Sequence, residues 1–145
     1  DAGLAVVVWS YPRGGDISKA GETAIDIVSY AAHMAAVVGA PIIKVKPPTP
    51  FTEQNENKKV YMSENIPIEN LRDRIKHVVQ SCFNGKRLVV FSGGSSRNKE
   101  DLLKEIKELY LGGASGSIVG RNSFQRPYDE ALHLLNQITN VYRGK

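Results

Sequence analysis

The chain has 145 residues, 41% of them hydrophobic, which is enough for one ordinary domain with a core of its own. Its formal charge of +4 comes from basic residues spread along the chain, without the basic stripe and interleaved aromatics typical of nucleic-acid binding. The single cysteine, Cys82, excludes an internal disulfide, and no apolar stretch reaches membrane-spanning length. Composition therefore favours a cytoplasmic protein that binds neither nucleic acid nor membrane, and whose mild positive charge suits small acidic molecules such as phosphates.

Four short runs rich in valine and isoleucine predict strands covered on both faces, as parallel strands are. The runs are Leu4–Tyr11, Ile42–Lys46, Arg87–Phe91 and Gly116–Val119. Apolar residues at helical spacing predict one helix after each strand: Glu22–Val38, Pro67–Cys82, Lys99–Leu111 and Pro127–Tyr142. Four β-α pairs predict a parallel α/β sheet of right-handed crossover units. Either a small open doubly wound sheet or half of a (β/α)8 barrel fits this order.

One segment departs from the alternation. Residues Pro47–Asn65 form a polar stretch rich in proline and asparagine, and we expect a long loop there. Loops of this length in compact domains are commonly lids, binding loops or interface elements. A disordered surface insertion is the alternative, and the sequence does not decide between the two.

Glycines follow the third and fourth predicted strands, where ligands of parallel sheets bind. Ser92-Gly93-Gly94 ends one strand, and Gly120-Arg121 ends the next. Glycine allows the backbone to approach a ligand, and backbone N–H groups with a guanidinium suit an anion. The glycines alone fit tight turns equally well, but Arg121 beside them favours a phosphate site.

Two lysines in one core strand are the least expected feature of the chain. Lys44 and Lys46 lie two residues apart, so their side chains share one face of the strand. At about 7 Å two such charges repel by roughly 2 kcal/mol, which favours the loss of a proton from one of them. A neutral lysine attacks carbonyl groups and forms Schiff bases. The pair therefore predicts a nucleophile, at a cost in stability.

The first strand ends with aromatic residues and an arginine. Tyr11 shares a face with Trp9, and its phenol is suited to passing a proton to and from a hydroxyl, or alternatively to simple packing at the rim. Arg13 either holds a phosphate or is solvated. The three histidines and Cys82 lie within predicted helices, and we interpret them as structural. Acidic residues are scarce at the strand ends, which argues against a metal-dependent mechanism.

Together these strand ends resemble the archaeal-type class I fructose-1,6-bisphosphate aldolases. The resemblance covers nearly the whole chain and is weakest between Pro47 and Arg87. It rests on four motifs: VVWSYPRGG (Val7–Gly15), IIKVK (Ile42–Lys46), VFSGG (Val90–Gly94) and GSIVGRNSFQRP (Gly116–Pro127).

The resemblance implies a lyase without metal or cofactor, in which a lysine forms a Schiff base with fructose 1,6-bisphosphate and releases two triose phosphates. Lys44 corresponds to that lysine, Lys46 to a neighbour that tunes it, and Tyr11 to the general acid/base. The remaining site residues would bind substrate. Trp9 lines the site, Arg13 meets one phosphate, and the other phosphate occupies a pocket of Ser92, Gly93, Gly94, Gly120 and Arg121.

Only strands five to eight of the family barrel are found in this sequence. We therefore expect residues 1–145 to be the C-terminal half of a (β/α)8 barrel aldolase, with the N-terminal half of the same barrel as its partner. Members of the family form homo-oligomers, often decamers. Two other functions remain open: a sister Schiff-base lyase or synthase acting on another sugar phosphate, and a non-catalytic sugar-phosphate-binding or assembly subunit.

Overall fold

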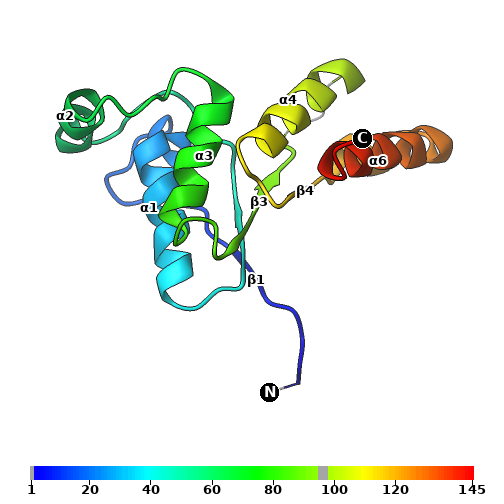
Figure 1. Cartoon of the computed structure of the whole chain (residues 1–145), viewed down its shortest axis with the longest axis horizontal. Coiled ribbons are helices and arrows are strands. Elements are labelled where there is room, and N and C mark those ends of the chain that lie inside the picture. The colour runs from blue at the N-terminus through cyan, green and yellow to red at the C-terminus, as the bar shows by residue number, and fades with distance from the viewer. Residues whose placement is uncertain (1, 95–97) are drawn as a thin grey trace.

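The computed structural model describes residues 2–94 and 98–145. It contains one sheet of four parallel strands, in the spatial order β1-β2-β3-β4 (Figure 1). The strands are β1 (Val7–Trp9), β2 (Ile42–Val45), β3 (Leu88–Ser92) and β4 (Gly116–Ile118). The predicted α/β class and the parallel sheet are confirmed, although β1 is much shorter than the apolar run Leu4–Tyr11 that predicted it.

The four predicted helices are all present, within a few residues of their expected bounds. They are α1 (Ile25–Val37), α3 (Leu71–Ser81), α4 (Lys99–Leu111) and α6 (Tyr128–Tyr142). Asn98 caps α4, where its side-chain oxygen accepts a hydrogen bond of 2.9 Å from the backbone N–H of Asp101. Among the described residues no helix has both the length and the apolar character needed to cross a membrane.

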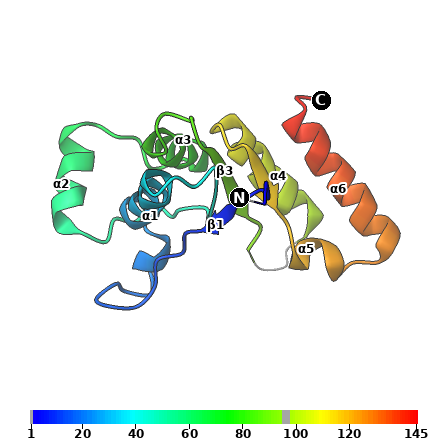
Figure 2. The same cartoon turned by 90° about the horizontal axis from the view of Figure 1, so that it is seen from below.

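Sequential strand order decides between the two architectures that the sequence allowed. In a doubly wound sheet the spatial order of the strands reverses at a switch point. In this sheet the spatial order follows the chain order throughout. Right-handed crossovers therefore place successive helices on the same face of the sheet. Each helix contacts the next in that layer: α1 with α3, α3 with α4, and α4 with α6 (Figure 2). This is the arrangement of a barrel wall rather than of an open doubly wound sheet.

The core lies between the sheet and the helices. Alternate strand residues point into it and are fully buried, namely Ile43, Val45, Val89 and Phe91. They pack against the apolar faces of the helices. Residues of the opposite parity face away from the helices, and several large apolar side chains among them are exposed. The sheet therefore has one covered face and one open face.

The segment Pro47–Asn65 is not only a loop, and this expectation was wrong. It contains a helix, α2 (Asn55–Ser63), which has no buried residue and so carries no apolar pattern that the sequence could reveal. Asp26 of α1 accepts hydrogen bonds of 3.0 Å from the backbone N–H groups of Glu53 and Gln54, where α2 begins. Two short elements were also not predicted: a 3-10 turn, η1 (Gly21–Thr23), and α5 (Arg121–Phe124).

Candidate active site

A cavity of about 560 Å³ lies at the carboxyl ends of the strands. Segments that follow all four strands line it: Tyr11 after β1, Lys46 after β2, Gly94 after β3 and Arg121 after β4. Arg13 and Ser92 also line this cavity. The structure thus brings together six of the ten residues that the sequence singled out, as expected for the functional end of a parallel sheet.

Lys44 lies on the open face of the sheet, beside this cavity. Its register neighbours are Trp9 on β1 and Val90 on β3. Although it is a lysine, only 6% of its surface is exposed, and its Nζ lies 3.4 Å from the centroid of the Trp9 ring. The indole face partly compensates for the lost hydration of an ammonium group. Trp9 and Lys44 do not line the cavity at the strand ends, so the two features adjoin rather than coincide.

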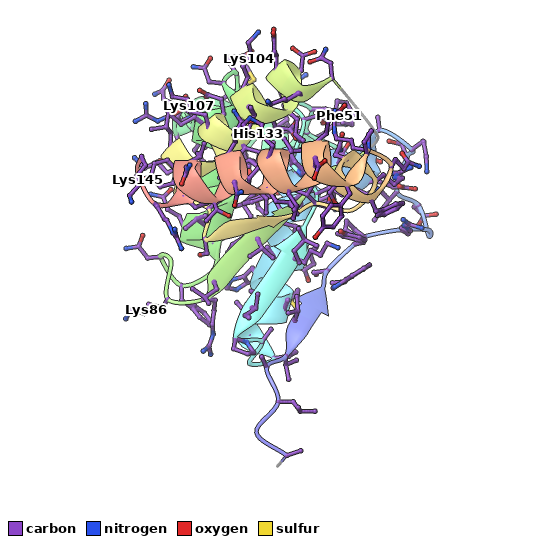
Figure 3. The ribbon with its side chains drawn as sticks, turned by 90° about the vertical axis from the view of Figure 1, so that its right-hand side faces the viewer. Phe51, Lys86, Lys104, Lys107, His133 and Lys145 are labelled. Atoms are coloured by element: carbon purple, nitrogen blue, oxygen red, sulfur yellow. The ribbon has the colours of Figure 1, made fainter. Side chains whose placement is uncertain are left out.

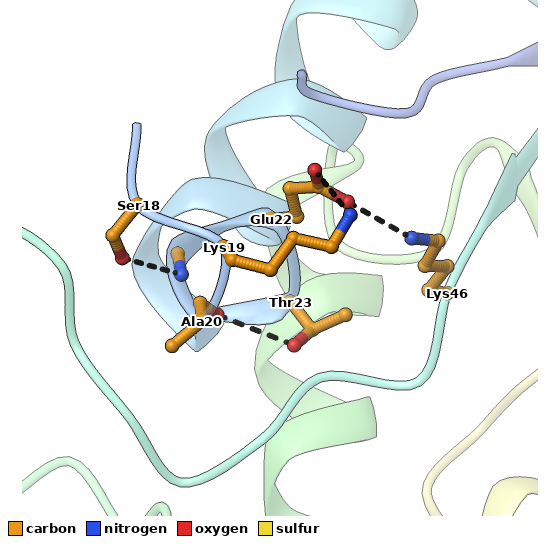
Figure 4. A network of polar contacts seen from close by, with 7 residues as sticks. Ser18, Lys19, Ala20, Glu22, Thr23 and Lys46 are labelled. Atoms are coloured by element: carbon orange, nitrogen blue, oxygen red, sulfur yellow. Dashed lines mark hydrogen bonds and ion pairs between the residues drawn. The ribbon is translucent and has the colours of Figure 1, made fainter. Parts of the chain in front are cut away.

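Lys46 has an acidic partner that the strand-end analysis missed. Its Nζ lies 3.5 Å from Oε2 of Glu22, and Oε1 of the same carboxylate accepts a 2.9 Å hydrogen bond from Lys19 (Figure 4). Lys46 also lies 5.9 Å from the centroid of the Tyr11 ring. The pKa of the Glu22 carboxyl is lowered, mainly by the hydrogen bond from Lys19, with a further contribution from Lys46. Glu22 follows β1 by thirteen residues, on η1, so no strand-end pattern pointed to it.

The glycine segments after β3 and β4 are bonded to one another. Arg121 donates a 3.1 Å hydrogen bond from Nη2 to the carbonyl oxygen of Gly94, and Asn122 donates one of 3.0 Å from Nδ2 to that of Gly93. Gly94 has a φ of +66°, in the left-handed region that favours glycine. These contacts fix the relative position of the two segments that the sequence assigned to a phosphate. Gly93 and Gly120 do not line the cavity.

The histidines and the cysteine lie away from the strand ends. His33 donates from Nδ1 to the carbonyl oxygen of Ser81 at 2.8 Å, and His77 shares a 2.7 Å hydrogen bond with the hydroxyl of Tyr61. Burial raises the pKa of the Cys82 thiol to about 11, which disfavours the reactive thiolate. Within residues 2–94 and 98–145, no group of three His, Cys, Asp or Glu side chains is placed to hold a metal ion.

Comparison with known proteins shows the family of the chain. The profile of the DeoC/LacD family aldolases matches residues 1–126. The chain belongs to this family. The probable fructose-bisphosphate aldolase class 1 of Chlamydia muridarum is 33% identical to it over 156 aligned positions, which cover 98% of this chain and 44% of the relative. The fructose-bisphosphate aldolase/6-deoxy-5-ketofructose 1-phosphate synthase of Methanocaldococcus jannaschii is 31% identical, over 94% of this chain and 37% of the relative.

A solved structure similar to this chain shows a covalent intermediate. It is an archaeal fructose-1,6-bisphosphate aldolase with its catalytic lysine covalently bound to the carbinolamine intermediate of the substrate. The present chain matches it with a TM-score of 0.71 and 31% identity, over 96% of this chain and 45% of that one. The chain thus spans less than half the length of the curated relatives it matches, and it has the fold of about half of the solved aldolase.

Proposed function

We propose that the chain carries the Schiff-base chemistry of a class I fructose-1,6-bisphosphate aldolase, which reversibly cleaves its substrate to dihydroxyacetone phosphate and glyceraldehyde 3-phosphate. The observation that carries this proposal is Lys44, a buried lysine on the face of the Trp9 ring and beside a cavity rich in cationic side chains. Membership of an aldolase family supports it. Burying a lysine without an acid partner is costly, and a covalent role accounts for the cost.

The residues divide the reaction between them. The Nζ of Lys44 attacks the ketose carbonyl carbon. The Tyr11 hydroxyl then gives its proton to the departing hydroxyl group, so that water leaves and an iminium ion and a Tyr11 phenolate remain. The Tyr11 phenolate takes the proton of the hydroxyl group two carbons away, so that the carbon–carbon bond breaks and its electron pair moves to the iminium nitrogen. The aldehyde leaves, and Tyr11 returns its proton to the enamine carbon. Water then hydrolyses the iminium ion, which releases the second product and Lys44, and the Tyr11 phenolate takes up the remaining proton. Every step balances without a cofactor or metal.

The cations around the cavity would hold the substrate in place. Arg121 and the backbone of the Ser92–Gly94 segment suit the phosphate on the dihydroxyacetone side, and Gly120 immediately precedes Arg121. Arg13 lies on the exposed segment after β1 and is one candidate for the other phosphate. Trp9 packs on Lys44 and limits the directions from which a carbonyl can approach it. Lys46, held between Glu22 and Tyr11, would adjust the charge around the nucleophile.

We further propose that residues 1–145 form strands five to eight of a (β/α)8 barrel, and that the first four strands cover the open face of the sheet. That face exposes apolar residues, Leu88 and Ile118 among them, and both edge strands, β1 and β4, have unpaired backbone groups. The relatives are about twice as long as this chain, which supports a second half of equal size. Assembly into a homo-oligomer in the cytoplasm completes the proposal.

A sister activity is the second candidate, because one relative is both a fructose-bisphosphate aldolase and a 6-deoxy-5-ketofructose 1-phosphate synthase. Both activities act on sugar phosphates, and the residues around Lys44 fit either. The choice between them is a choice of substrate rather than of nucleophile. A non-catalytic sugar-phosphate-binding subunit would keep the cavity and have no need of a reactive Lys44.

Borohydride trapping tests the proposal directly, in the protein expressed from its complete gene. Fructose 1,6-bisphosphate with borohydride should add the reduced substrate to the peptide that contains Lys44, as seen by mass spectrometry, and Lys44→Arg should abolish the adduct. Lys58→Arg, on the exposed helix α2, is the matched control and should keep it. An adduct that persists in Lys44→Arg would overturn the assignment of the nucleophile. Phosphate binding without any adduct would favour the non-catalytic subunit.

A further inference from the structure

Arg74 is a buried cation that the proposed mechanism does not use. It lies on α3, with 8% of its surface exposed, and its Nε donates a 2.8 Å hydrogen bond to the carbonyl oxygen of Pro48. Its Nη1 donates hydrogen bonds of 2.6 Å to the carbonyl oxygens of Ile68 and Glu69. All three acceptors are neutral backbone groups. No carboxylate of the described residues lies within ion-pair distance of the guanidinium.

The second amino group of the Arg74 guanidinium, Nη2, takes no part in these three hydrogen bonds. Arg74 lines the cavity at the strand ends, and its Nη2 has no hydrogen-bond partner among residues 2–94 and 98–145. Glu105 lines the same cavity from α4 but forms no ion pair with Arg74. Burial lowers the pKa of the guanidinium, although Glu69 and Asp73 nearby act in the opposite direction. A buried guanidinium held by three carbonyl groups, with an amino group at a cavity that no described residue bonds, is suited to an anion that arrives from outside.

The position of Arg74 points to one end of the substrate. Arg74 is bonded to Pro48, which follows β2, whereas Arg121 follows β4, and both line the cavity. Strands β2 and β4 are separated by β3, so they are about 10 Å apart. That separation suits two phosphates at opposite ends of a short sugar. Arg13, the other candidate for the second phosphate, is on an exposed segment, whereas Arg74 is already fixed in place.

We propose that Arg74 is a specificity-determining residue that binds the second phosphate of the substrate, at the end opposite the one held by Arg121. This inference rests on the proposed aldolase function. Preorganisation is its physical basis, because an arginine already fixed by three hydrogen bonds loses little side-chain entropy when the phosphate binds. The bond it would add is charge-assisted on both sides, the stronger class of hydrogen bond.

The test compares two substrates in the protein expressed from its complete gene: fructose 1,6-bisphosphate, and fructose 1-phosphate, which lacks the second phosphate. Arg74→Gln should lower kcat/KM for the bisphosphate by roughly 10- to 100-fold, the range expected for a lost charged hydrogen bond, mainly through KM. It should leave kcat/KM for the monophosphate nearly unchanged. Arg72→Gln, on the exposed side of the same helix, is the matched control and should alter neither substrate.

The ratio of kcat/KM for the bisphosphate to kcat/KM for the monophosphate separates phosphate recognition from a merely structural role of Arg74. If Arg74 only braces the segment after β2, both substrates lose the same factor in Arg74→Gln, and the inference is overturned while the aldolase function stands. Arg74→Lys gives a second comparison, because lysine keeps the positive charge but lacks the paired N–H groups of the guanidinium. It should reduce the kcat/KM ratio less than Arg74→Gln does. A wild-type protein that cleaves neither substrate would overturn the proposed function and this inference together.

Discussion

The side chain of Lys46 contacts residues from two other segments of the chain. Glu22, on η1, supplies the carboxylate, while Tyr11 supplies an aromatic face. The Glu22 carboxylate lies within ion-pair distance of Lys46, which is two residues along the chain from Lys44. In the proposed site, Glu22 therefore compensates part of the Lys46 charge.

His77 makes the stability of the fold depend on pH. Burial lowers the pKa of His77 below its ordinary value of 6.5, so the folded chain binds fewer protons than the unfolded chain in the pH range just below 6.5. The stabilising contribution is therefore complete above pH 6.5 and is lost as the pH falls through the lowered pKa. One such group changes the free energy of unfolding by at most about 1.4 kcal/mol per pH unit.

We predict that His77→Gln, which keeps an acceptor for the Tyr61 hydroxyl, flattens the pH dependence of stability between about pH 5 and 7. Urea unfolding at several pH values measures this. His133→Gln, on the exposed side of α6 (Figure 3), should leave the wild-type dependence intact. Equal slopes for wild type and His77→Gln would refute the role of His77.

Lys44, Tyr11 and Arg121 could be predicted from the sequence as candidate site residues. Side chains at the carboxyl ends of parallel strands meet at one edge of the sheet, and each of the three lies at or just after a predicted strand end. The positions of Glu22 and Arg74 near the site could not be predicted in this way. Both lie on helical segments, and their approach to the site depends on how those segments pack against the strand ends. Residues that contact the site through packing have no fixed spacing from it in sequence.

At the scale of elements, α2 is the clearest case of tertiary structure that the sequence concealed. Its residues are all at least partly exposed, so it has no apolar face to produce a helical period. The helix begins where Asp26, a buried carboxylate on α1, accepts two backbone N–H groups and a 3.1 Å hydrogen bond from the Asn57 side chain. An acid supplied by another helix takes the place of a cap encoded within α2 itself.

The end of α4 is close-packed against α3 at Gly112. A Cβ atom added there would lie 2.6 Å from Cβ of Ile75 and 2.7 Å from the carbonyl oxygen of Arg72, and neither can move without shifting α3. We predict that Gly112→Ala destabilises the chain by about 1–3 kcal/mol, as overpacking generally does. Gly112 has a φ of −78°, so backbone strain contributes nothing.

Gly116→Ala is the matched control for this prediction. Its added Cβ would lie 3.6 Å from Cγ1 of Val90, an ordinary van der Waals contact. Chemical denaturation of the two variants should show a loss for Gly112→Ala alone. A Gly112→Ala variant as stable as the wild type would mean that α3 and α4 separate at little cost.

At the scale of the whole molecule, Lys104 and Lys107 of α4 and Lys145 lie on the outer helical surface (Figure 3). The opposite side of the sheet exposes apolar residues. Trp9 on that open side is 63% exposed, and Leu88 is 52% exposed. Large exposed apolar patches mark interaction surfaces. In the proposed barrel this patch becomes the interior, and Lys44 lies at its rim.

Trp9 is the only tryptophan in the sequence, so its fluorescence reports on this face alone. In the 145-residue chain by itself, we predict the long-wavelength emission of a solvated indole and efficient quenching by acrylamide. In the protein expressed from its complete gene, the emission should shift to shorter wavelength and the quenching should fall, because the other barrel strands remove water from Trp9. Trp9→Phe supplies the background from tyrosine in both samples. Identical emission and quenching in the two proteins would show that nothing covers this face, and the proposed half-barrel would then be wrong.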